Sequence, residues 1–146
     1  IGRPGCSSGM GRSTSPIMVK IIELPKIHDP RGNLTFVQNN DQIPFKIARV
    51  FWTYDVPGGE TRGGHAYNRQ EEFIVALSGS FDVVIKDGQG KITRHSLNRS
   101  YYGLYLPPLT WRHMENFSTN ALSLHLSSHV YDTEDYIRDF EVYRQL

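Results

Sequence analysis

The chain has 146 residues, of which 16 are Lys or Arg and 15 are Asp or Glu, so its formal net charge at pH 7 is +1. This balance argues against a nucleic-acid-binding protein, which usually carries a basic face, and against a polybasic membrane anchor. No apolar run reaches the roughly 20 residues of a membrane-spanning helix. The lone cysteine, Cys6, rules out a disulfide framework and a CxxC redox site. We therefore expect a cytoplasmic protein that binds neither nucleic acid nor a membrane.

Residues 1–17, IGRPGCSSGMGRSTSPI, are rich in Gly, Ser and Pro and show no apolar period. Such a segment cannot bury enough surface to offset its ordering entropy, and it lacks the apolar core of a signal peptide. We expect a disordered or non-native leader, with a flexible arm that orders on a partner as the alternative. Residues 18–146 are then expected to form one domain, as suits a chain of this length.

After Met18, short runs of β-branched and aromatic residues recur between Gly, Pro, Asn and Asp, which is typical of β-strands. The expected strands, in chain order, are Val19–Glu23, Leu34–Gln38, Ile47–Tyr54, Glu72–Ser78, Ser80–Lys86, Lys91–Ser96, Tyr101–Leu106 and Asn120–Ser127. The segment Asp87–Gly90 has the composition of a hairpin turn.

A helical period occurs near the end of the chain. Asp132 and the acids that follow it can cap a helix, and a single apolar face is then formed by Tyr136, Ile137, Phe140 and Tyr143. The sequence thus predicts an all-β domain, a jelly roll or small double-sheet barrel, with one short C-terminal helix.

The densest group of polar residues lies between Gly58 and Glu72 and begins in a Gly-rich loop. In a strand, alternate side chains face the same way, so His65 and Tyr67 share one side, which in a barrel can be the cavity. Glu71 would join them if the same register continued. The alternative is that these are exposed polar residues at a strand end.

A second group follows Pro107 and Pro108. On a strand there, Trp111 and His113 share one face and Arg112 takes the other, unless a bulge redirects it. A core Trp beside a surface Arg explains the local pattern equally well.

The order of these two groups resembles the two motifs of the cupin superfamily. The matching residues are Gly59, His65, Glu71 or Glu72, and Gly79 in the first motif, and Pro108 and His113 in the second. Cupins commonly hold a divalent metal with three His and one Glu, but here Tyr67 stands in place of the second His. At most three usual ligands remain, and we expect no bound metal.

A narrower resemblance covers nearly all of residues 18–146. Five segments, HDPRGNL (28–34), IPFKIARV (43–50), RGGHA (62–66), GLY (103–105) and YDTEDYIR (131–138), are similar in content and order to the sugar-nucleotide 3,4-ketoisomerases. Those enzymes act on TDP-4-keto-6-deoxyglucose. The resemblance implies a metal- and cofactor-independent jelly-roll isomerase of bacterial deoxysugar synthesis, whose product feeds an aminotransferase. It also implies a homodimer, in some members with exchanged N-terminal strands, although Val19–Glu23 could equally pair within its own chain.

The resemblance also carries over residue roles. The family's catalytic pair lies in a His-Ala-His motif, so the first His falls on His65 and the second on Tyr67. Arg31 and Arg62 match arginines expected at the substrate, with Arg62 near the nucleotide. Arg112 occupies a position associated with the stereochemistry of the product. Apart from the resemblance, thymine needs an aromatic platform, for which Phe51, Trp52, Tyr54 and Tyr105 are candidates, and Glu71 is a further expected substrate-binding residue.

A 3,4-ketoisomerisation proceeds through an enediol or enediolate and needs a base that titrates near the working pH, which imidazole does at ~6.5. We expect His65 to be that base and Tyr67 to be the acid or the shuttle for the proton between the two oxygens, since a neutral phenol is already a donor. Alternatively, Arg31 or Arg62 holds Tyr67 ionised as the base. The competing functions are a sugar-nucleotide-binding protein without catalysis, a different reaction on a related keto-sugar, and a metal-dependent cupin enzyme.

Overall fold

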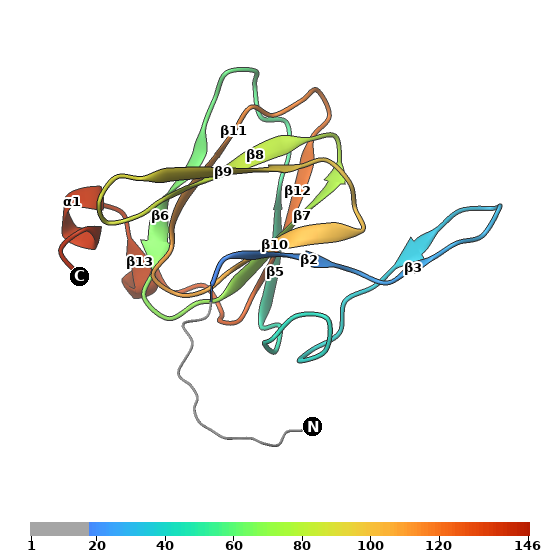
Figure 1. Cartoon of the computed structure of the whole chain (residues 1–146), viewed down its shortest axis with the longest axis horizontal. Coiled ribbons are helices and arrows are strands. Elements are labelled where there is room, and N and C mark those ends of the chain that lie inside the picture. The colour runs from blue at the N-terminus through green and yellow to red at the C-terminus, as the bar shows by residue number, and fades with distance from the viewer. Residues whose placement is uncertain (1–17) are drawn as a thin grey trace.

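The computed structural model describes residues 18–146, so the expectations for the leader and for Cys6 lie outside the described residues. Two five-stranded antiparallel sheets face each other (Figure 1). Sheet one has the order β2 (Lys20–Glu23), β10 (Tyr102–Leu106), β7 (Glu72–Ser78), β12 (Leu122–Ser127) and β5 (Arg49–Thr53). Sheet two has the order β13 (Tyr136–Ile137), β6 (Arg62–Tyr67), β11 (Trp111–Glu115), β8 (Phe81–Lys86) and β9 (Ile92–Leu97). This arrangement confirms the expected double-sheet, all-β architecture.

The two remaining strands, β3 (Lys26–Ile27) and β4 (Leu34–Thr35), pair as a small two-stranded ribbon that projects away from the two sheets (Figure 1). We call residues 26–35 the arm. The expected strand Leu34–Gln38 is therefore much shorter than predicted. The first expected strand does form, and β2 pairs with β10 of its own chain.

The core lies between the two sheets at one end of the barrel. Alternate residues of the central strand β7 point inward, so Ile74 and Ala76 join Phe81, Val83 and Leu104 in a fully buried cluster. The same inward row continues to Glu72 at the other end of the barrel, where polar groups replace aliphatic ones. The alternation that builds the core thus also points the polar groups into the barrel.

The C-terminal helix is shorter than predicted and starts later. Asp132 does cap a turn, a 3-10 helix over Thr133–Asp135, but Tyr136 and Ile137 then form a strand paired with β6. The helix α1 (Phe140–Tyr143) follows, capped by Asp139. The prediction that Tyr136 and Ile137 lie on the helix is wrong because the free edge of β6 offers backbone hydrogen bonds that local periodicity does not reveal. Among residues 18–146, no helix has the length and apolar character needed to cross a membrane.

A bulge in β6 decides which of its side chains reach the interior. Arg112 pairs with His65 and Met114 with Arg62, so three steps along β6 match two steps along β11. Gly63, at φ 81°, supplies the left-handed conformation that such a bulge requires and that a side chain would strain. Because of the extra residue, Arg62 and His65 lie on the same side although they are an odd number of positions apart.

Candidate active site

A cavity of about 420 Å³ opens at the polar end of the barrel. Both sheets contribute to it, with β5, β7 and β12 on one wall and β6, β11 and β13 on the other. Its lining consists of Phe51, Thr53, Thr61, Arg62, Gly63, His65, Tyr67, Glu72, Ile74, Arg112, Met114, His125, Tyr136 and Arg138. The cavity therefore brings together four buried polar or charged side chains of residues 18–146, those of Tyr67, Glu72, Arg112 and His125.

His65 presents a neutral imidazole to this cavity. Its Nε2 atom is buried and has no hydrogen-bond partner among residues 18–146. Burial, assisted by the nearby positive charge of Arg112, lowers the pKa of His65 to about 3. This pKa is well below the ~6.5 that the sequence-based expectation assumed for the base, because the ring is buried. At neutral pH one ring nitrogen is thus unprotonated, so the side chain can accept a proton from a bound molecule.

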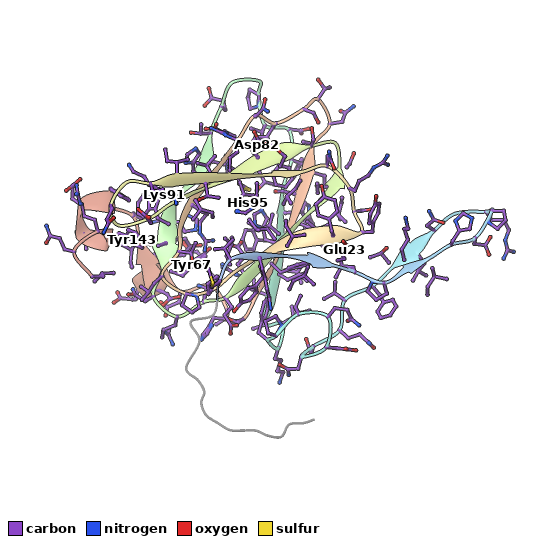
Figure 2. The ribbon with its side chains drawn as sticks, viewed as in Figure 1. Glu23, Tyr67, Asp82, Lys91, His95 and Tyr143 are labelled. Atoms are coloured by element: carbon purple, nitrogen blue, oxygen red, sulfur yellow. The ribbon has the colours of Figure 1, made fainter. Side chains whose placement is uncertain are left out.

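Tyr67 stands beside His65, with the ring centroids 4.7 Å apart, and is almost completely buried. Figure 2 shows Tyr67 within the body of the molecule, at the end of β6 that faces β13. Its hydroxyl donates to the Tyr136 hydroxyl at 3.3 Å. Burial, with the nearby Glu72 carboxylate, raises the pKa of Tyr67 above its usual value, although the Arg112 guanidinium lies 5.0 Å from the ring centre. Tyr67 is therefore a neutral proton donor, which disfavours the alternative of an ionised phenol.

A buried network of hydrogen bonds and charges lies next to His65 and Tyr67. The Arg112 Nη1 donates to one carboxylate oxygen of Glu72, and the His125 Nδ1 lies 2.7 Å from the other. Ser123 Oγ in turn lies 2.9 Å from His125 Nε2. Burial alone would raise the pKa of Glu72, but the charges of Arg112 and His125 outweigh it and lower the value to about 2. Glu72 is thus ionised and the network holds a fixed ion pair under the cavity.

Arg112 keeps one donor free for a ligand. Its Nη2 atom is buried and has no partner among the described residues. Buried donors are rarely left unpaired in native proteins, so this one at a cavity wall is available to donate to a ligand oxygen.

Four of the expected site residues, His65, Tyr67, Arg62 and Arg112, line the cavity. The aromatic candidate Phe51 lines it too, with its ring stacked 4.4 Å from that of His125. The expected alternation around Arg112 is confirmed, since Arg112 faces inward while its neighbour Trp111 packs outward against Phe140.

The other expected site residues lie elsewhere. Glu71 does not continue the β6 register, because the chain turns before β7 and Glu72 becomes the inward residue. Glu71 instead accepts a hydrogen bond from Tyr105 Oη at 2.6 Å, and Tyr105 packs in the cluster on the outer face of sheet one. Trp52 and Tyr54 are more than half exposed and do not line the cavity, because β5 turns Phe51 and Thr53 inward. These four placements are corrections to the sequence-based expectation.

Arg31 is also absent from the cavity of its own chain. It lies at the tip of the arm, pairs with Asp29 at 3.0 Å, and its side chain is 90% exposed. Within one chain, the arm projects away from the two sheets (Figure 1), and Arg31 is not among the residues that line the cavity.

Four ionisable cavity residues, Glu72, His125, Tyr136 and Arg138, were given no role at the substrate by the sequence, in which Glu72 was considered only as a metal ligand of the cupin motif. His125 has the same inward parity as Ser123 and Ser127 on β12, a pattern of small polar residues that points to a polar interior. Tyr136 and Arg138 carried no such signal, because β13, which contains Tyr136 and ends just before Arg138, forms only by pairing with β6.

The side chains that could serve as cupin metal ligands do not converge. His113 faces the outer side of β11, where its Nε2 lies 2.7 Å from Glu115, and Glu72 is engaged by Arg112 and His125. No group of three His, Cys, Asp or Glu side chains among residues 18–146 is arranged to hold a metal ion.

We expect Glu72→Gln to destabilise the protein by about 3 kcal/mol, because removing one partner of a buried ion pair leaves the other charge uncompensated. Glu71→Gln is the matched control, since it changes the adjacent carboxylate on the outer face and is expected to cost about 1 kcal/mol through its hydrogen bond to Tyr105. Urea unfolding followed by circular dichroism measures both free energies. Equal losses for the two variants would contradict the assigned role of Glu72.

Known proteins with the same architecture are similar to this chain over most of its length. A curated TDP-4-oxo-6-deoxy-alpha-D-glucose-3,4-oxoisomerase from Aneurinibacillus thermoaerophilus is 38% identical over 126 residues, which are 86% of this chain and 90% of that protein. The crystal structure of a variant of the 3,4-ketoisomerase QdtA from Thermoanaerobacterium thermosaccharolyticum, in complex with TDP-4-keto-6-deoxyglucose, superposes with a TM-score of 0.84 at 33% identity, covering 87% and 91% of the two chains.

The WlaRB TDP-quinovose 3,4-ketoisomerase from Campylobacter jejuni superposes with a TM-score of 0.83 at 38% identity, covering 88% of this chain and 98% of that one. A family model described as "FdtA: WxcM-like, C-terminal" matches residues 17–146. With the double-sheet barrel and the cavity residues described above, these matches show that the chain belongs to the FdtA, WxcM-like C-terminal family.

Proposed function

We propose that the protein is a sugar-nucleotide 3,4-ketoisomerase that moves the keto group of TDP-4-keto-6-deoxyglucose from carbon 4 to carbon 3. The observation that carries this proposal is the neutral, unpartnered imidazole of His65 beside the un-ionised phenol of Tyr67 in one cavity wall. A base and a proton donor on the same wall are what an enediol intermediate requires. The 38% identical oxoisomerase and the ketoisomerase structures support the choice of substrate.

The chain's own residues then take these roles. Arg62 and Arg138, both exposed at the cavity, are suited to grip the diphosphate, because guanidinium groups bind phosphate oxygens in a bidentate manner. Phe51 offers the aromatic surface on the cavity side of β5, in place of Trp52 and Tyr54. The sugar is thereby directed toward His65 and Tyr67.

The reaction is a pair of proton transfers. His65 removes the proton at carbon 3, the electron pair of that bond forms the double bond between carbons 3 and 4, and the carbonyl oxygen becomes an enediolate oxygen. The free Nη2 of Arg112 stabilises this developing charge, as preorganised donors do in a buried site. The imidazolium of His65 returns its proton at carbon 4. Tyr67 assists the proton transfer between the two oxygens, which leaves the keto group on carbon 3.

In D2O, the wild-type protein is expected to convert TDP-4-keto-6-deoxyglucose to the 3-keto isomer with incorporation of deuterium, as followed by proton NMR. His65→Asn should lower the rate by at least ~10³-fold, and Tyr67→Phe by ~10²-fold, the range typical of a lost general acid or base. His113→Asn, on the outer face of β11, is the matched control and should retain activity.

Different outcomes distinguish the competing functions. Exchange that survives His65→Asn would contradict the role of His65 as base. Calorimetric binding of TDP-sugars without exchange would indicate a binding protein, and loss of activity with a chelator would indicate a metal-dependent enzyme.

The low pKa of His65 predicts an unusual pH profile. Because the imidazole stays neutral until the pH approaches about 3, kcat/KM should stay level between pH 7.5 and 5. An ordinary imidazole with a pKa of ~6.5 would lose about 90% of its base form by pH 5.5. A midpoint near 6.5 in the kcat/KM profile would contradict this prediction. It would mean either that another group is the base or that the His65 imidazole keeps the pKa it has in water.

The lowered pKa of His65 also determines how the folding stability changes with pH. Between about pH 6.5 and 3 the unfolded chain binds a proton at His65 that the folded chain does not, so stability decreases as the pH falls through this range. Circular dichroism at each pH measures the folded fraction, so that a loss of activity through unfolding is distinguished from a loss through protonation of His65.

We also propose that the protein is a cytoplasmic homodimer. An isolated two-stranded ribbon is marginal in water, yet the arm exposes Ile27 and Leu34 by more than half. Next to it, a cavity of about 520 Å³ lies against the outer face of sheet one and is lined by Val75, Leu77 and Leu124. A second copy would cover both apolar surfaces, and its arm would bring Arg31 toward the cavity of the first copy.

This arrangement predicts complementation between inactive variants. Arg31→Ala and His65→Asn should each be inactive alone, whereas subunit exchange should restore about a quarter of the wild-type activity, because each mixed dimer contains one intact composite site. Analytical ultracentrifugation gives the oligomeric state of each sample. A monomer, or exchange of subunits without recovery of activity, would contradict the shared site.

A further inference from the structure

Tyr136 shares the cavity wall with the two expected catalytic residues. It lies directly opposite Tyr67 in the antiparallel pair of β13 with β6, and side chains directly opposite each other point to the same side of a sheet. The ring centroid of Tyr136 lies 4.8 Å from that of Tyr67 and 5.1 Å from that of His65. Three rings from two strands therefore meet at one point of the wall.

The hydrogen bond between the two phenols has a direction. Tyr67 donates to Tyr136 Oη at 3.3 Å, and this bond contributes to raising the pKa of Tyr67. Tyr136 therefore keeps its own proton for another acceptor. Tyr67 is 1% exposed, whereas Tyr136 is only partly buried and lines the cavity. The hydrogen bond is therefore donated by the buried phenol of Tyr67 to the more accessible phenol of Tyr136.

Tyr136 is also held in place from outside. The Arg138 guanidinium lies 4.2 Å from the centre of its ring, and the ring of Tyr131 packs edge-on at 5.9 Å. A cation over an aromatic face is attracted by the ring's negative charge density, which restrains the ring orientation. The hydroxyl is thus presented to the cavity in a defined position.

We infer that Tyr136 is a catalytic residue that completes a two-phenol relay for the proton passed between the sugar oxygens, an inference that rests on the proposed ketoisomerase function. While His65 carries the proton from carbon 3 to carbon 4, the hydroxyl on carbon 3 gives its proton to Tyr67 Oη. Tyr67 gives its own proton to Tyr136 Oη, and Tyr136 protonates the oxygen on carbon 4.

The relay balances without an ionised phenol. Each tyrosine breaks one O–H bond and forms another, the electron pair of the oxygen on carbon 3 becomes the new carbonyl bond, and the double bond between the carbons forms the new C–H bond at carbon 4. Neither phenol needs to become a phenolate, which agrees with the raised pKa of Tyr67. Two hydroxyls 3.3 Å apart also match two oxygens on adjacent carbons.

The test uses Tyr136→Phe, with Tyr131→Phe as the matched control, because Tyr131 is 59% exposed and does not line the cavity. This control removes a phenol hydroxyl but keeps the ring that packs against Tyr136. Tyr136→Phe is expected to lower kcat for the 3-keto product by about 10²-fold, the usual effect of losing one proton-transfer group. Binding of TDP by calorimetry should be unchanged. Deuterium exchange at carbon 3 of the recovered substrate should persist, since His65 is intact, so the ratio of exchange to isomerisation should rise. Tyr131→Phe should behave as the wild type.

Three results would overturn the relay: a kcat for Tyr136→Phe within about twofold of the wild type, an equal loss of exchange and isomerisation, or the same loss in Tyr131→Phe. A wild-type protein that neither exchanges nor isomerises would instead refute the proposed function itself. Should Tyr136→Phe fail to fold, Tyr136→His decides the question. A histidine can also relay a proton, so isomerisation should be retained in part, and its complete loss in a folded Tyr136→His protein would count against the relay.

Discussion

The ion pair between Arg112 and Glu72 is the constraint on which the cavity depends. It joins β11 of one sheet to β7 of the other, and both side chains are almost fully buried. Taking two charges out of water is costly, and that cost is offset only when both partners are in place with further hydrogen bonds. Such pairs add little net stability, so the value of this one lies in holding the two walls of the cavity at a fixed separation and register.

The same pair determines the electrostatics of the proposed chemistry. A guanidinium beneath the cavity contributes to keeping His65 neutral and can receive a developing negative charge. Glu72 accepts a hydrogen bond from that guanidinium and is itself held by His125, and the Nε of Arg112 donates to the Thr110 carbonyl. The guanidinium therefore has little freedom to reorient when a ligand binds. A preorganised positive group is an efficient stabiliser of a developing negative charge such as that of an enediolate.

Two local irregularities then bring side chains onto the cavity walls. The bulge at Gly63 changes the alternation of β6, so that Arg62 and His65 both line the cavity. The short strand β13 closes the edge of sheet two and adds Tyr136 opposite Tyr67. An unbroken β6, or an exposed edge, would leave the cavity with fewer of these groups. The irregular backbone is therefore part of the site.

The sequence alone determined most of the strands, the double-sheet architecture and the pairing of His65 with Tyr67, because strand alternation and turn composition act between near neighbours in the chain. Only the tertiary structure decided that Glu72 rather than Glu71 faces inward, and that Phe51 rather than Trp52 or Tyr54 lines the cavity. It also decided that Tyr136 lies in a strand and that Arg31 stands on a projecting arm. Each of these outcomes depends on hydrogen bonds or packing with residues distant in the sequence, and local periodicity carries no information about such partners.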